Sequence, residues 1–411
     1  MALRHRCGHE TVTPDRRGRP ASRIVSRTLK RILLLGGGHT HLLAATVLAH
    51  RTAGHAQVSL VSPSATLLYS GMMPGWISGA YPLDACSIDV RNACRAGGIE
   101  WIDDRVVDVD FPAREVVGQA ARYRFDLLSV NVGSVSDAGE GAGAQDAPRV
   151  LGAKPFAAFV PAWERWWHAC ERAPGARRLT VVGGGAAAIE IAFAMARLAL
   201  APGPLTGSRV TLAHAGASLL GGRAGAAAWL ATRGLRARGV ELRAQHRYTG
   251  ARDGLAHFDG MPAIASDLVV VATGPRPAPW LLEAARRDGV ALAPDGGIAV
   301  RADLRSTSHA ALFAAGDCAS FVDRRIAKSG VHAIRQAGAL AANLAAVATG
   351  ARTPVLAAFR ARRWTLALLD RCDGSAIASW GPLAYAGGSM GRWKERIDRR
   401  FVARFRQGPG A

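Results

Sequence analysis

The chain has 411 residues, 49% of them hydrophobic, which is enough for two or three domains with buried cores. Its 52 Lys and Arg residues exceed its 31 Asp and Glu residues, but they are mostly arginines spread along the chain, which indicates a coding bias and no nucleic-acid partner. No apolar stretch approaches the roughly 18 residues needed to cross a bilayer, which excludes a membrane-spanning protein.

Residues 1–29 form a basic segment that contains Pro14 and Pro20 but no apolar core of the kind found in secretory signals. We expect a disordered tail or an overextended start of the chain. An Arg-rich transit peptide is the alternative.

The next segment has the pattern of a βαβ unit. An apolar run over residues 32–35 predicts a strand, helical apolar spacing over 42–48 predicts a helix, and the run at 58–61 predicts a second strand. Between the first strand and the helix stand Gly36, Gly37 and Gly38, followed by His39. Glycines at this position let backbone N–H groups and the positive end of the helix meet a pyrophosphate, so we expect a dinucleotide site.

This first fingerprint departs from the usual pattern at two positions. His41 stands where a Gly or Ala normally allows close helix packing, and Ser62 stands where an acidic residue normally binds a ribose hydroxyl. Ser62 can still form a hydrogen bond with a ribose, but only as a neutral partner. The turn-rich segment 67–84, with Met72 and Met73, could face a cofactor ring or could simply pack.

A second βαβ unit begins near residue 178. A strand is followed by Gly183, Gly185 and Ala188 at G-x-G-x-x-A spacing, then by a helix and another strand. His214 stands at the end of that strand, where an acid would favour a free ribose 2′-hydroxyl and an Arg would favour a 2′-phosphate. His214 favours neither NADH nor NADPH. Two fingerprints imply one cofactor that stays bound and one that exchanges.

From about Lys30 to Ala346 the motifs occur in the order GGGHTH, VNVGS, VVGGGAAAIE, VVVATGPRP and LFAAGDCA. This order resembles the two-dinucleotide-binding-domain flavoproteins of the pyridine nucleotide-disulfide oxidoreductase superfamily. The lack of a C-x4-C motif argues against a disulfide reductase, and type II NADH dehydrogenases are more similar. More similar still is the flavoprotein found alone or fused to selenophosphate synthase (selenide, water dikinase), on YSGMMPGWISGAY, AKPF around Lys154, and RWKERIDRRFVARF.

The resemblance implies an α/β fold with two Rossmann-like FAD- and NAD(P)-binding domains in a glutathione reductase-like architecture. The FAD-binding domain would be discontinuous, over residues 30–150 and 275–345. The NAD(P)H-binding domain would span 151–274, and a C-terminal segment would span 346–411. A linker is expected at 138–148.

The resemblance also implies the site residues. FAD pyrophosphate would lie at Gly36–Gly38, its ribityl hydroxyls at Asp317 after Gly316, and its ring near the helix that begins at Gly330 and Val331, whose positive end would stabilise the reduced ring. The remaining implied positions are Ser62, Val106 and Gly133 for FAD, and Gly183, Gly185, Glu190, His214 and Gly274 for NAD(P)H. Lys328 and Glu190 are the candidate catalytic residues, because Lys328 is a retained lysine two residues before that helix.

The C-terminal segment has the pattern of a basic amphipathic helix. Trp393, Ile397, Phe401 and Phe405 recur every four residues among seven basic residues, Lys394 included. Such a helix can lie on an anionic bilayer, as type II NADH dehydrogenases do through C-terminal helices, or it can pack on its own protein or on a homodimer mate. Because hydride chemistry would precede Ala346, we expect the helix to be dispensable for it.

The six cysteines are scattered without zinc-type pairing, so we expect no metal and a reducing, cytoplasmic setting, with peripheral attachment to the inner face of the plasma membrane as an option. The sequence predicts an FAD-dependent oxidoreductase that takes hydride from NAD(P)H and passes electrons to an acceptor, with a quinone as one candidate. A sulfide:quinone-type enzyme, which would need thiols such as Cys170, Cys318 or Cys372, is one alternative. A flavin-containing redox sensor or partner linked to selenium metabolism is the other.

Overall fold

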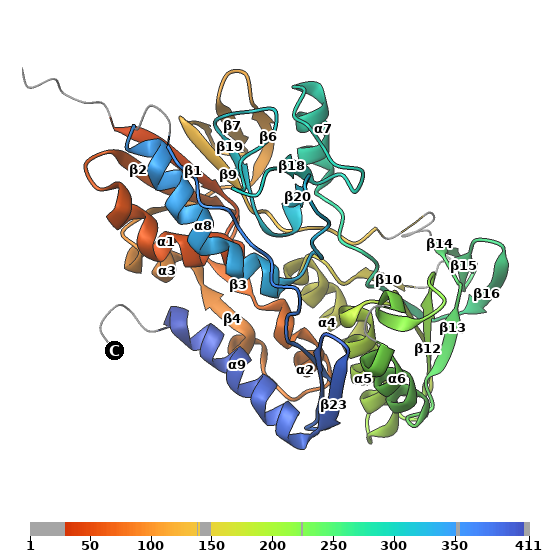
Figure 1. Ribbon diagram of the computed structural model, residues 1–411. Helices are drawn as coiled ribbons and strands as arrows, with labels where there is room; N and C mark the ends of the chain where they lie inside the picture. Colours follow the sequence, from red (N-terminus) through yellow and green to blue (C-terminus); the bar gives the residue numbers. More distant parts are fainter. Residues whose placement is uncertain (1–28, 138, 140–148, 223–224, 351–353, 407–411) are drawn as a thin grey trace, which may run out of the picture.

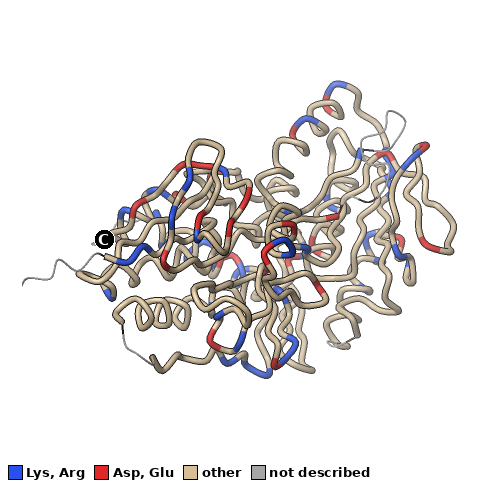
Figure 2. The backbone as a smooth tube through the Cα atoms, turned by 90° about the horizontal axis from the view of Figure 1, so that it is seen from above, with Lys and Arg blue, Asp and Glu red and all other residues tan. Residues whose placement is uncertain are grey.

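The computed structural model describes residues 29–137, 139, 149–222, 225–350 and 354–406. The basic tail expected at residues 1–29 and the linker expected at 138–148 therefore lie almost entirely outside the described residues. Figure 1 shows two lobes, each built on a twisted sheet, with the C-terminal helix lying along their lower side. In Figure 2, basic and acidic residues are interspersed over both lobes.

The first sheet has five strands in the order β19-β9-β1-β2-β5, and all neighbours are parallel. Strands covered on both faces read as continuous apolar runs, and β1 and β9 are accordingly buried over most of their length. The strands are β1 (Lys30–Leu35), β2 (Ala56–Ser62), β5 (Glu100–Asp103), β9 (Leu127–Val130) and β19 (Leu312–Ala314). Helices α1 (His39–Thr52), α3 (Val90–Ala96) and α8 (Gly330–Ala348) cover one face, with α1 and α8 side by side (Figure 1).

The second sheet has the order β10-β17-β11-β12-β13, again with all neighbours parallel. Its four strands from β17 to β13 correspond to β9-β1-β2-β5, but its edge strand β10 comes first in the chain, whereas β19 comes last. Its strands are β10 (Arg149–Gly152), β11 (Arg178–Val182), β12 (Arg209–His214), β13 (Glu241–Ala244) and β17 (Leu268–Val271). Its helices are α4 (Phe156–Arg172), α5 (Ala186–Leu200) and α6 (Gly225–Arg236). Two five-stranded parallel sheets that share the order of four strands confirm the predicted α/β class with two Rossmann-like units.

Each unit carries a small antiparallel meander and short connecting elements. The meanders are β6 (Val106–Asp110), β7 (Glu115–Gly118) and β8 (Arg122–Arg124), and β14 (Tyr248–Arg252), β15 (Leu255–Phe258) and β16 (Met261–Ala265). The remaining elements are β3 (Thr66–Leu68), η1 (Ser70–Met72), α2 (Met73–Ile77), η2 (Leu83–Cys86), β4 (Ser87–Asp89), η3 (Leu219–Gly222), α7 (Pro279–Arg287), β18 (Ile298–Val300), η4 (Gly316–Cys318) and β20 (Ala319–Phe321). Because β19 completes the sheet that β1 begins, we propose the discontinuous domain division given above, with boundaries near 150 and 275.

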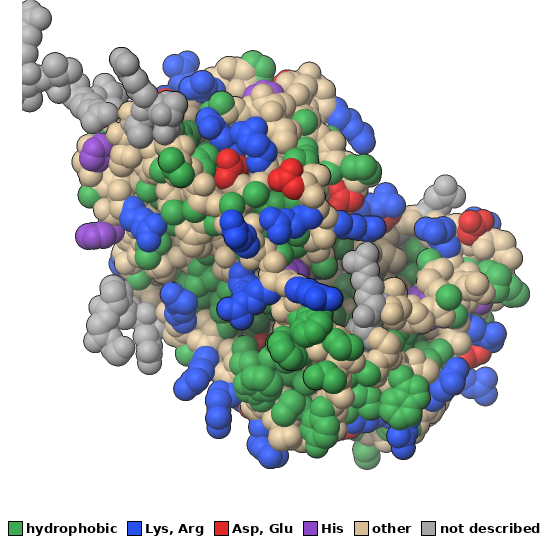
Figure 3. Space-filling view, in the orientation of Figure 1, with side chains coloured by type: hydrophobic (Ala, Val, Ile, Leu, Met, Phe, Trp, Pro, Cys, Tyr) green, Lys and Arg blue, Asp and Glu red, His purple; other side chains and the backbone are tan. Residues whose placement is uncertain are grey.

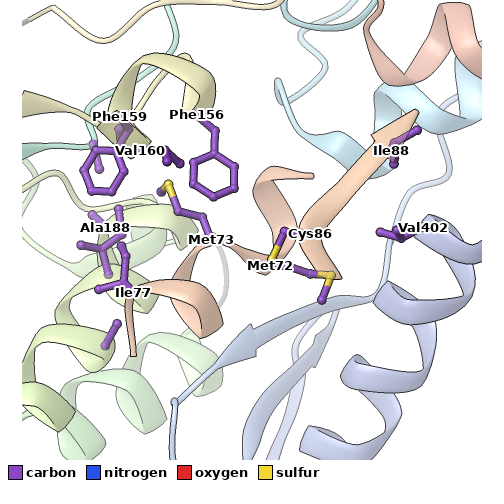
Figure 4. Packing of buried hydrophobic residues seen from close by; sticks show 14 of the residues in the cluster. Met72, Met73, Ile77, Cys86, Ile88, Phe156, Phe159, Val160, Ala188 and Val402 are labelled. Atoms are coloured by element: carbon purple, nitrogen blue, oxygen red, sulfur yellow. The ribbon is translucent and has the colours of Figure 1, made fainter. Parts of the chain in front are cut away.

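The segment that carries Met72 and Met73 is core material between the two units. Both side chains are buried, and Figure 4 shows Met73 among Phe156, Phe159 and Val160 of α4, with Met72 beside Cys86. Flexible thioethers suit such an irregular junction. Met73 therefore packs the two units against each other, and Met72 fills the core of the first unit beside it.

The C-terminal segment forms a three-stranded antiparallel sheet and the final helix α9 (Gly388–Arg406); the strands are β21 (Ala367–Asp370), β22 (Ala376–Trp380) and β23 (Leu383–Gly387). Helix α9 packs against α3, β4 and β22. Phe405 is 3% exposed, whereas Trp393 and Ile397 are 42% and 40% exposed. Lys394, expected on the basic rim, is buried instead. The helix thus belongs to the folded protein, and only the first half of its apolar stripe faces outward.

Candidate functional site

The first site lies at the carboxyl edge of the first sheet. Strands β1 and β9 are neighbours, but β1 is followed by a crossover to β2 on one side, while β19 lies on the other side of β9. In open parallel sheets such a reversal of strand order opens a crevice at the carboxyl ends, where ligands bind. Gly36, Ser62, Gly133 and Asp317 all follow or end strands at this edge.

Two of the three glycines in this loop, Gly36 and Gly38, leave no room for a side chain. Gly36 has φ +92°, and a Cβ there would lie 2.7 Å from the backbone oxygen of Asn131. A Cβ on Gly38, which caps α1, would overlap Oδ1 of the same asparagine. Close backbone approach therefore explains these glycines, as expected where a helix N-terminus holds a pyrophosphate.

Asn131 is a residue of this site that the sequence argument missed. Its Nδ2 donates to the Ala315 oxygen at 2.8 Å, which links β9 to β19, while its buried Oδ1 has no partner among the described residues. A buried acceptor without a partner is costly unless a ligand or solvent completes it. The motif VNVGS contained this residue, but only its glycine had been singled out.

Two helix N-termini converge here. The Thr40 hydroxyl on α1 donates to the Ala333 oxygen on α8 at 2.8 Å, across 293 residues of sequence. Ser329 caps α8 by accepting from the His332 N–H, so Gly330 and Val331 form the exposed first turn of that helix. Both positive helix ends thus lie at one place, which suits a ligand that carries negative charge.

His41 explains how the first fingerprint tolerates a large third residue. Its ring is fully buried, with Nδ1 at 2.7 Å from the Gly36 oxygen and Nε2 at 2.8 Å from the Ser129 hydroxyl. Burial lowers the pKa of His41 to about 4, so it is neutral and can donate through one nitrogen and accept through the other. The histidine therefore fastens the glycine loop to β9.

His39, the first residue of α1, turns its ring toward Tyr69 and Phe401, with ring centroids 5.4 and 5.5 Å away. Its Nε2 is buried without a partner among the described residues. Burial lowers the pKa of His39 to about 4, while the charge of Asp317 acts in the opposite direction. His39 is therefore a neutral group at the helix end, and its Nε2 is available for a hydrogen bond to a ligand.

Asp317 lies at the end of β19, where Gly316 makes the turn at φ +65°. Its Oδ2 accepts from the Lys154 ammonium at 2.5 Å and from the Ser134 hydroxyl at 2.7 Å. Within the described part of the chain Oδ1 has no hydrogen-bond partner. One oxygen is thus fixed by protein groups, and the other is left for a ligand hydroxyl.

Ser62 and Val106 lie toward the opposite end of this edge. The Ser62 hydroxyl would be 3.4 Å from a Cβ on Gly37, and Val106 begins β6. Beside them is a surface pocket of about 360 Å³ lined by Pro63, Asp103, Asp104, Arg105, Gln119 and Ala120. Gly133, at φ +76°, has open space where a Cβ would stand. A long ligand could therefore extend from Asp317 past the glycines to this pocket.

Lys328 is engaged by protein. Its ammonium lies 3.1 Å from Asp295, and the side chain is only 10% exposed. Asp295 also accepts from the Ser320 hydroxyl at 2.7 Å. The structure therefore gives Lys328 an ion-pair partner two residues before α8, as well as its predicted place near the helix start.

The second site repeats this plan at the edge of the second sheet. A Cβ on Gly183, at φ +138°, would overlap the Ala272 oxygen, whereas Gly185, which caps α5, and Gly274 face open space. His214 is 4% exposed, and its Nδ1 has no partner among the described residues. Burial lowers the pKa of His214, so it offers a neutral nitrogen. These four residues are thus brought together around the N-terminus of α5.

Glu190, on α5, points instead into a buried polar cluster with α9. Its Oε1 accepts from the Asp370 N–H at 2.8 Å and lies 4.0 Å from the Lys394 ammonium. Burial raises the pKa of Glu190 to about 7, against the attraction of Lys394. The ammonium also donates to Asp398 at 2.7 Å, and Asp398 accepts from the Tyr69 hydroxyl at 3.2 Å. Glu190 is therefore joined to the His39 neighbourhood through α9.

The residues that the structure describes contain no cluster of three or more His, Cys, Asp or Glu side chains that could hold a metal ion. No helix among the described ranges is both long and apolar enough to span a bilayer. The glycine cradles and the free acceptors at Asn131 and Asp317 fit a dinucleotide with a polyhydroxyl chain.

A sequence model of the family described as pyridine nucleotide-disulphide oxidoreductase matches residues 30–337. No curated protein matches the sequence. The fold is similar to that of the sulfide:quinone oxidoreductase from the hyperthermophilic bacterium Aquifex aeolicus, at 15% identity over 92% of each chain with a TM-score of 0.76. It is also similar to NDH2 from Plasmodium falciparum, solved in complex with NADH, at 12% identity over 91% of this chain and 97% of that one, with a TM-score of 0.74.

Proposed function

Because the chain belongs to the pyridine nucleotide-disulphide oxidoreductase family and is an FAD-dependent oxidoreductase, we propose that it is a type II NADH dehydrogenase-like enzyme that passes electrons from NAD(P)H to a quinone. The observation that carries the proposal is the contact between the carboxyl edges of the two sheets. Lys154 follows β10 of the second sheet, and its ammonium lies 2.5 Å from Asp317 at the edge of the first. Dinucleotides bound at two sheet edges that meet in this way would suit hydride transfer from one ring to another.

Bound FAD would supply a ring that accepts hydride from NAD(P)H and gives electrons to the acceptor. The residues of the chain would bind the two dinucleotides and orient their rings. Gly36–Gly38 and the start of α1 would hold the pyrophosphate, Asp317 Oδ1 would accept from a ribityl hydroxyl, and the first turn of α8 would place partial positive charge by the ring. Gly183, Gly185 and α5 would hold the nicotinamide dinucleotide. No side-chain acid or base is needed for the hydride step.

The cysteines argue against the sulfide:quinone alternative. Burial raises the pKa of Cys318 to about 12, and its thiol donates to the Gly133 oxygen at 3.2 Å. Burial also raises the pKa of Cys170 and, well above its ordinary value, that of Cys372. Thiols held in the protonated form are poor carriers of sulfur. The link to selenophosphate synthase rests on motif resemblance alone, whereas the redox-sensor alternative rests on the neutral residues Ser62 and His214 at the two ribose positions.

The proposal is tested with purified protein under argon. We expect a yellow protein whose FAD is released by acid, whose colour is bleached by NADH or NADPH, and whose colour returns when a short-chain quinone is added. If dithionite bleaches the protein but neither NADH nor NADPH does, the proposed hydride transfer from NAD(P)H is contradicted. If NAD(P)H bleaches the protein but a quinone does not restore the colour, the protein is still an NAD(P)H oxidoreductase, and the proposal that a quinone is its acceptor is wrong.

His214 is expected to set the preference between the two nucleotides. Its unpartnered Nδ1 lies at the end of β12, beside Gly184 of the second glycine loop. His214→Glu should favour NADH, because a carboxylate binds a ribose 2′-hydroxyl, and His214→Arg should favour NADPH, because a guanidinium binds a 2′-phosphate. The ratio of kcat/KM for NADH and NADPH measures this, with His214→Gln as the neutral control. Equal ratios in all three variants would place His214 outside the nucleotide site.

We propose that the exposed apolar side chains of the C-terminal sheet, together with the start of α9, rest on an anionic membrane surface. These side chains are Trp380, Leu383, Tyr385, Trp393 and Ile397, joined by Trp364, which precedes the sheet and contacts Trp380; all are 39% to 64% exposed. Figure 3 shows hydrophobic side chains gathered on the lower part of this face, with basic side chains beside them. Apolar side chains bordered by Arg match a lipid headgroup boundary. The same side chains could instead form a homodimer interface. If they bind a membrane, we propose that it is the inner face of the plasma membrane.

Trp380→Ser/Leu383→Ser should lower binding to anionic vesicles at least about tenfold, because burying each such side chain contributes roughly 1.5–3 kcal/mol. Vesicle co-sedimentation at low and high salt measures this. Salt should weaken the basic contribution and leave the apolar one. The matched control is Val107→Ser/Val322→Ser, two exposed apolar residues in other elements. If the first variant instead turns a dimer into a monomer with unchanged vesicle binding, these side chains form a subunit interface.

A further inference from the structure

Lys154 is the cation that the second unit places in the first unit's site. It follows β10, the edge strand of the second sheet, directly after Ala153. Its ammonium contacts Asp317 at 2.5 Å and the Ser134 hydroxyl at 3.3 Å, both of which belong to the first site. The pair spans 163 residues of sequence. A group from one unit is thus seated against the carboxylate that would bind the other unit's cofactor.

The position of Lys154 is fixed by its backbone. Its N–H donates to the Ser136 hydroxyl at 3.0 Å, and its oxygen accepts from the Ser136 N–H at 3.0 Å. These two bonds tie the end of β10 to the segment that follows β9. The backbone of Lys154 is therefore fixed at the point from which its side chain extends toward Asp317.

Charge at this point is closely balanced. Burial alone would raise the pKa of Asp317, but the Lys154 ammonium and the hydrogen bonds from Lys154 and Ser134 hold it below its ordinary value. The carboxylate is 15% exposed and the ammonium 34% exposed. Lysine is also rare in this chain, where Arg supplies almost every other basic residue. A compact ammonium differs from a guanidinium in size and hydration, which favours a specific need here.

We propose that Lys154 is a cofactor-site residue that neutralises Asp317, so that the added negative charge of the reduced cofactor is not opposed by a bare carboxylate. This rests on the proposed FAD site. Asp317 can then bind ribityl hydroxyls without making reduction of the ring less favourable. The same ion pair joins the two sheet edges, so the electrostatic balance depends on the two units being docked.

The test is a charge cycle read out as the midpoint potential of bound FAD, titrated with dithionite and a reference dye, without NAD(P)H. Lys154→Met should shift the potential to more negative values, because Asp317 is left uncompensated. Asp317→Asn, which keeps an acceptor oxygen, should shift it to more positive values. The double variant should lie closer to wild type than either single variant, and Lys154→Arg should retain the wild-type value. Lys30→Met, at a lysine that donates to the Val347 oxygen away from the site, is the matched control.

A Lys154→Met potential equal to that of the control would overturn the proposal. So would an equal shift in Lys154→Arg, since that variant keeps the charge. If Lys154→Met fails to fold, Lys154→Gln carries the same prediction. The titration uses dithionite, so it does not depend on NAD(P)H. If NADH does not reduce the protein but the variants shift the potential as expected, the proposed NAD(P)H activity is wrong and the role of Lys154 is supported.

Discussion

Asp317→Ala is expected to lose most of the FAD that purifies with the wild-type protein. The free Oδ1 would no longer accept from a ribityl hydroxyl, and the Lys154 ammonium and Ser134 hydroxyl would lose the acceptor they share. A buried polar group left without a partner costs about 1–3 kcal/mol, so the ribityl hydroxyl that loses Oδ1 weakens FAD binding by about one to two orders of magnitude. The ratio of flavin to protein absorbance after gel filtration measures occupancy.

The matched control is Asp323→Ala, an exposed aspartate in the loop that follows β20. It should purify with full occupancy. Denaturant melts of apoprotein separate a weakened site from a weakened fold, because the lost contacts to Lys154 and Ser134 lower the stability of the apoprotein, whereas the lost Oδ1 lowers the affinity for FAD. Occupancy equal to wild type in Asp317→Ala would remove this residue from the cofactor site.

Lys394→Met should be the most destabilising single change in the C-terminal helix. The ammonium donates to Asp398 and to the Gly71 oxygen at 2.8 Å, and it lies 4.0 Å from Glu190. Removing it leaves two buried carboxylates without their cation, and breaking a buried pair from one side costs about 3–5 kcal/mol. Urea denaturation measures the loss. Arg396→Met, an exposed basic residue on the same helix, should stay near wild type.

The loss in Lys394→Met should shrink as the pH falls. In the wild type, burial raises the pKa of Glu190 to about 7, so between its ordinary value and about 7 the folded protein holds a proton that the unfolded chain has released. Stability from this group therefore falls as pH rises through that range. Without Lys394, Glu190 and Asp398 hold protons at still higher pH, with Asp370 nearby adding repulsion. Equal losses at pH 5.5 and pH 8 would contradict this account.

Because Lys394 and Asp398 belong to this buried network, removing α9 should disturb the folded protein as well as any surface that the helix provides. Its pattern of apolar and basic residues indicated a surface helix dispensable for hydride chemistry. However, Val402 and Phe405 are buried, and Lys394 and Asp398 connect the helix to Glu190 and Tyr69. Helical periodicity predicts which face of the helix is apolar, but such a face can pack against lipid or against protein. The sequence could not tell that its second half packs on α3 and β4.

The glycine loops were predictable because their chemistry is local. A strand, a glycine turn and a helix lie within a few dozen residues, and the strained φ values at Gly36 and Gly183 follow from that turn. Lys154, Asn131 and His41 could not be assigned in this way, since their roles depend on residues elsewhere: Asp317, Ala315 and Ser129. Motif order implied the Asp317 site, but only tertiary contact identifies the ammonium that accompanies it.

The late position of β19 in the chain has a consequence for biosynthesis. The second sheet is made from residues 149–271 without interruption, whereas the first sheet lacks β19 and its covering helix α8 until residue 348 has been made. Chains fold from the ribosome in order of emergence, so the second unit can form while the first is still open. FAD capture must then wait until residue 348 has left the ribosome. A ribosome-bound chain stalled before residue 312 should bind nicotinamide nucleotide and no flavin.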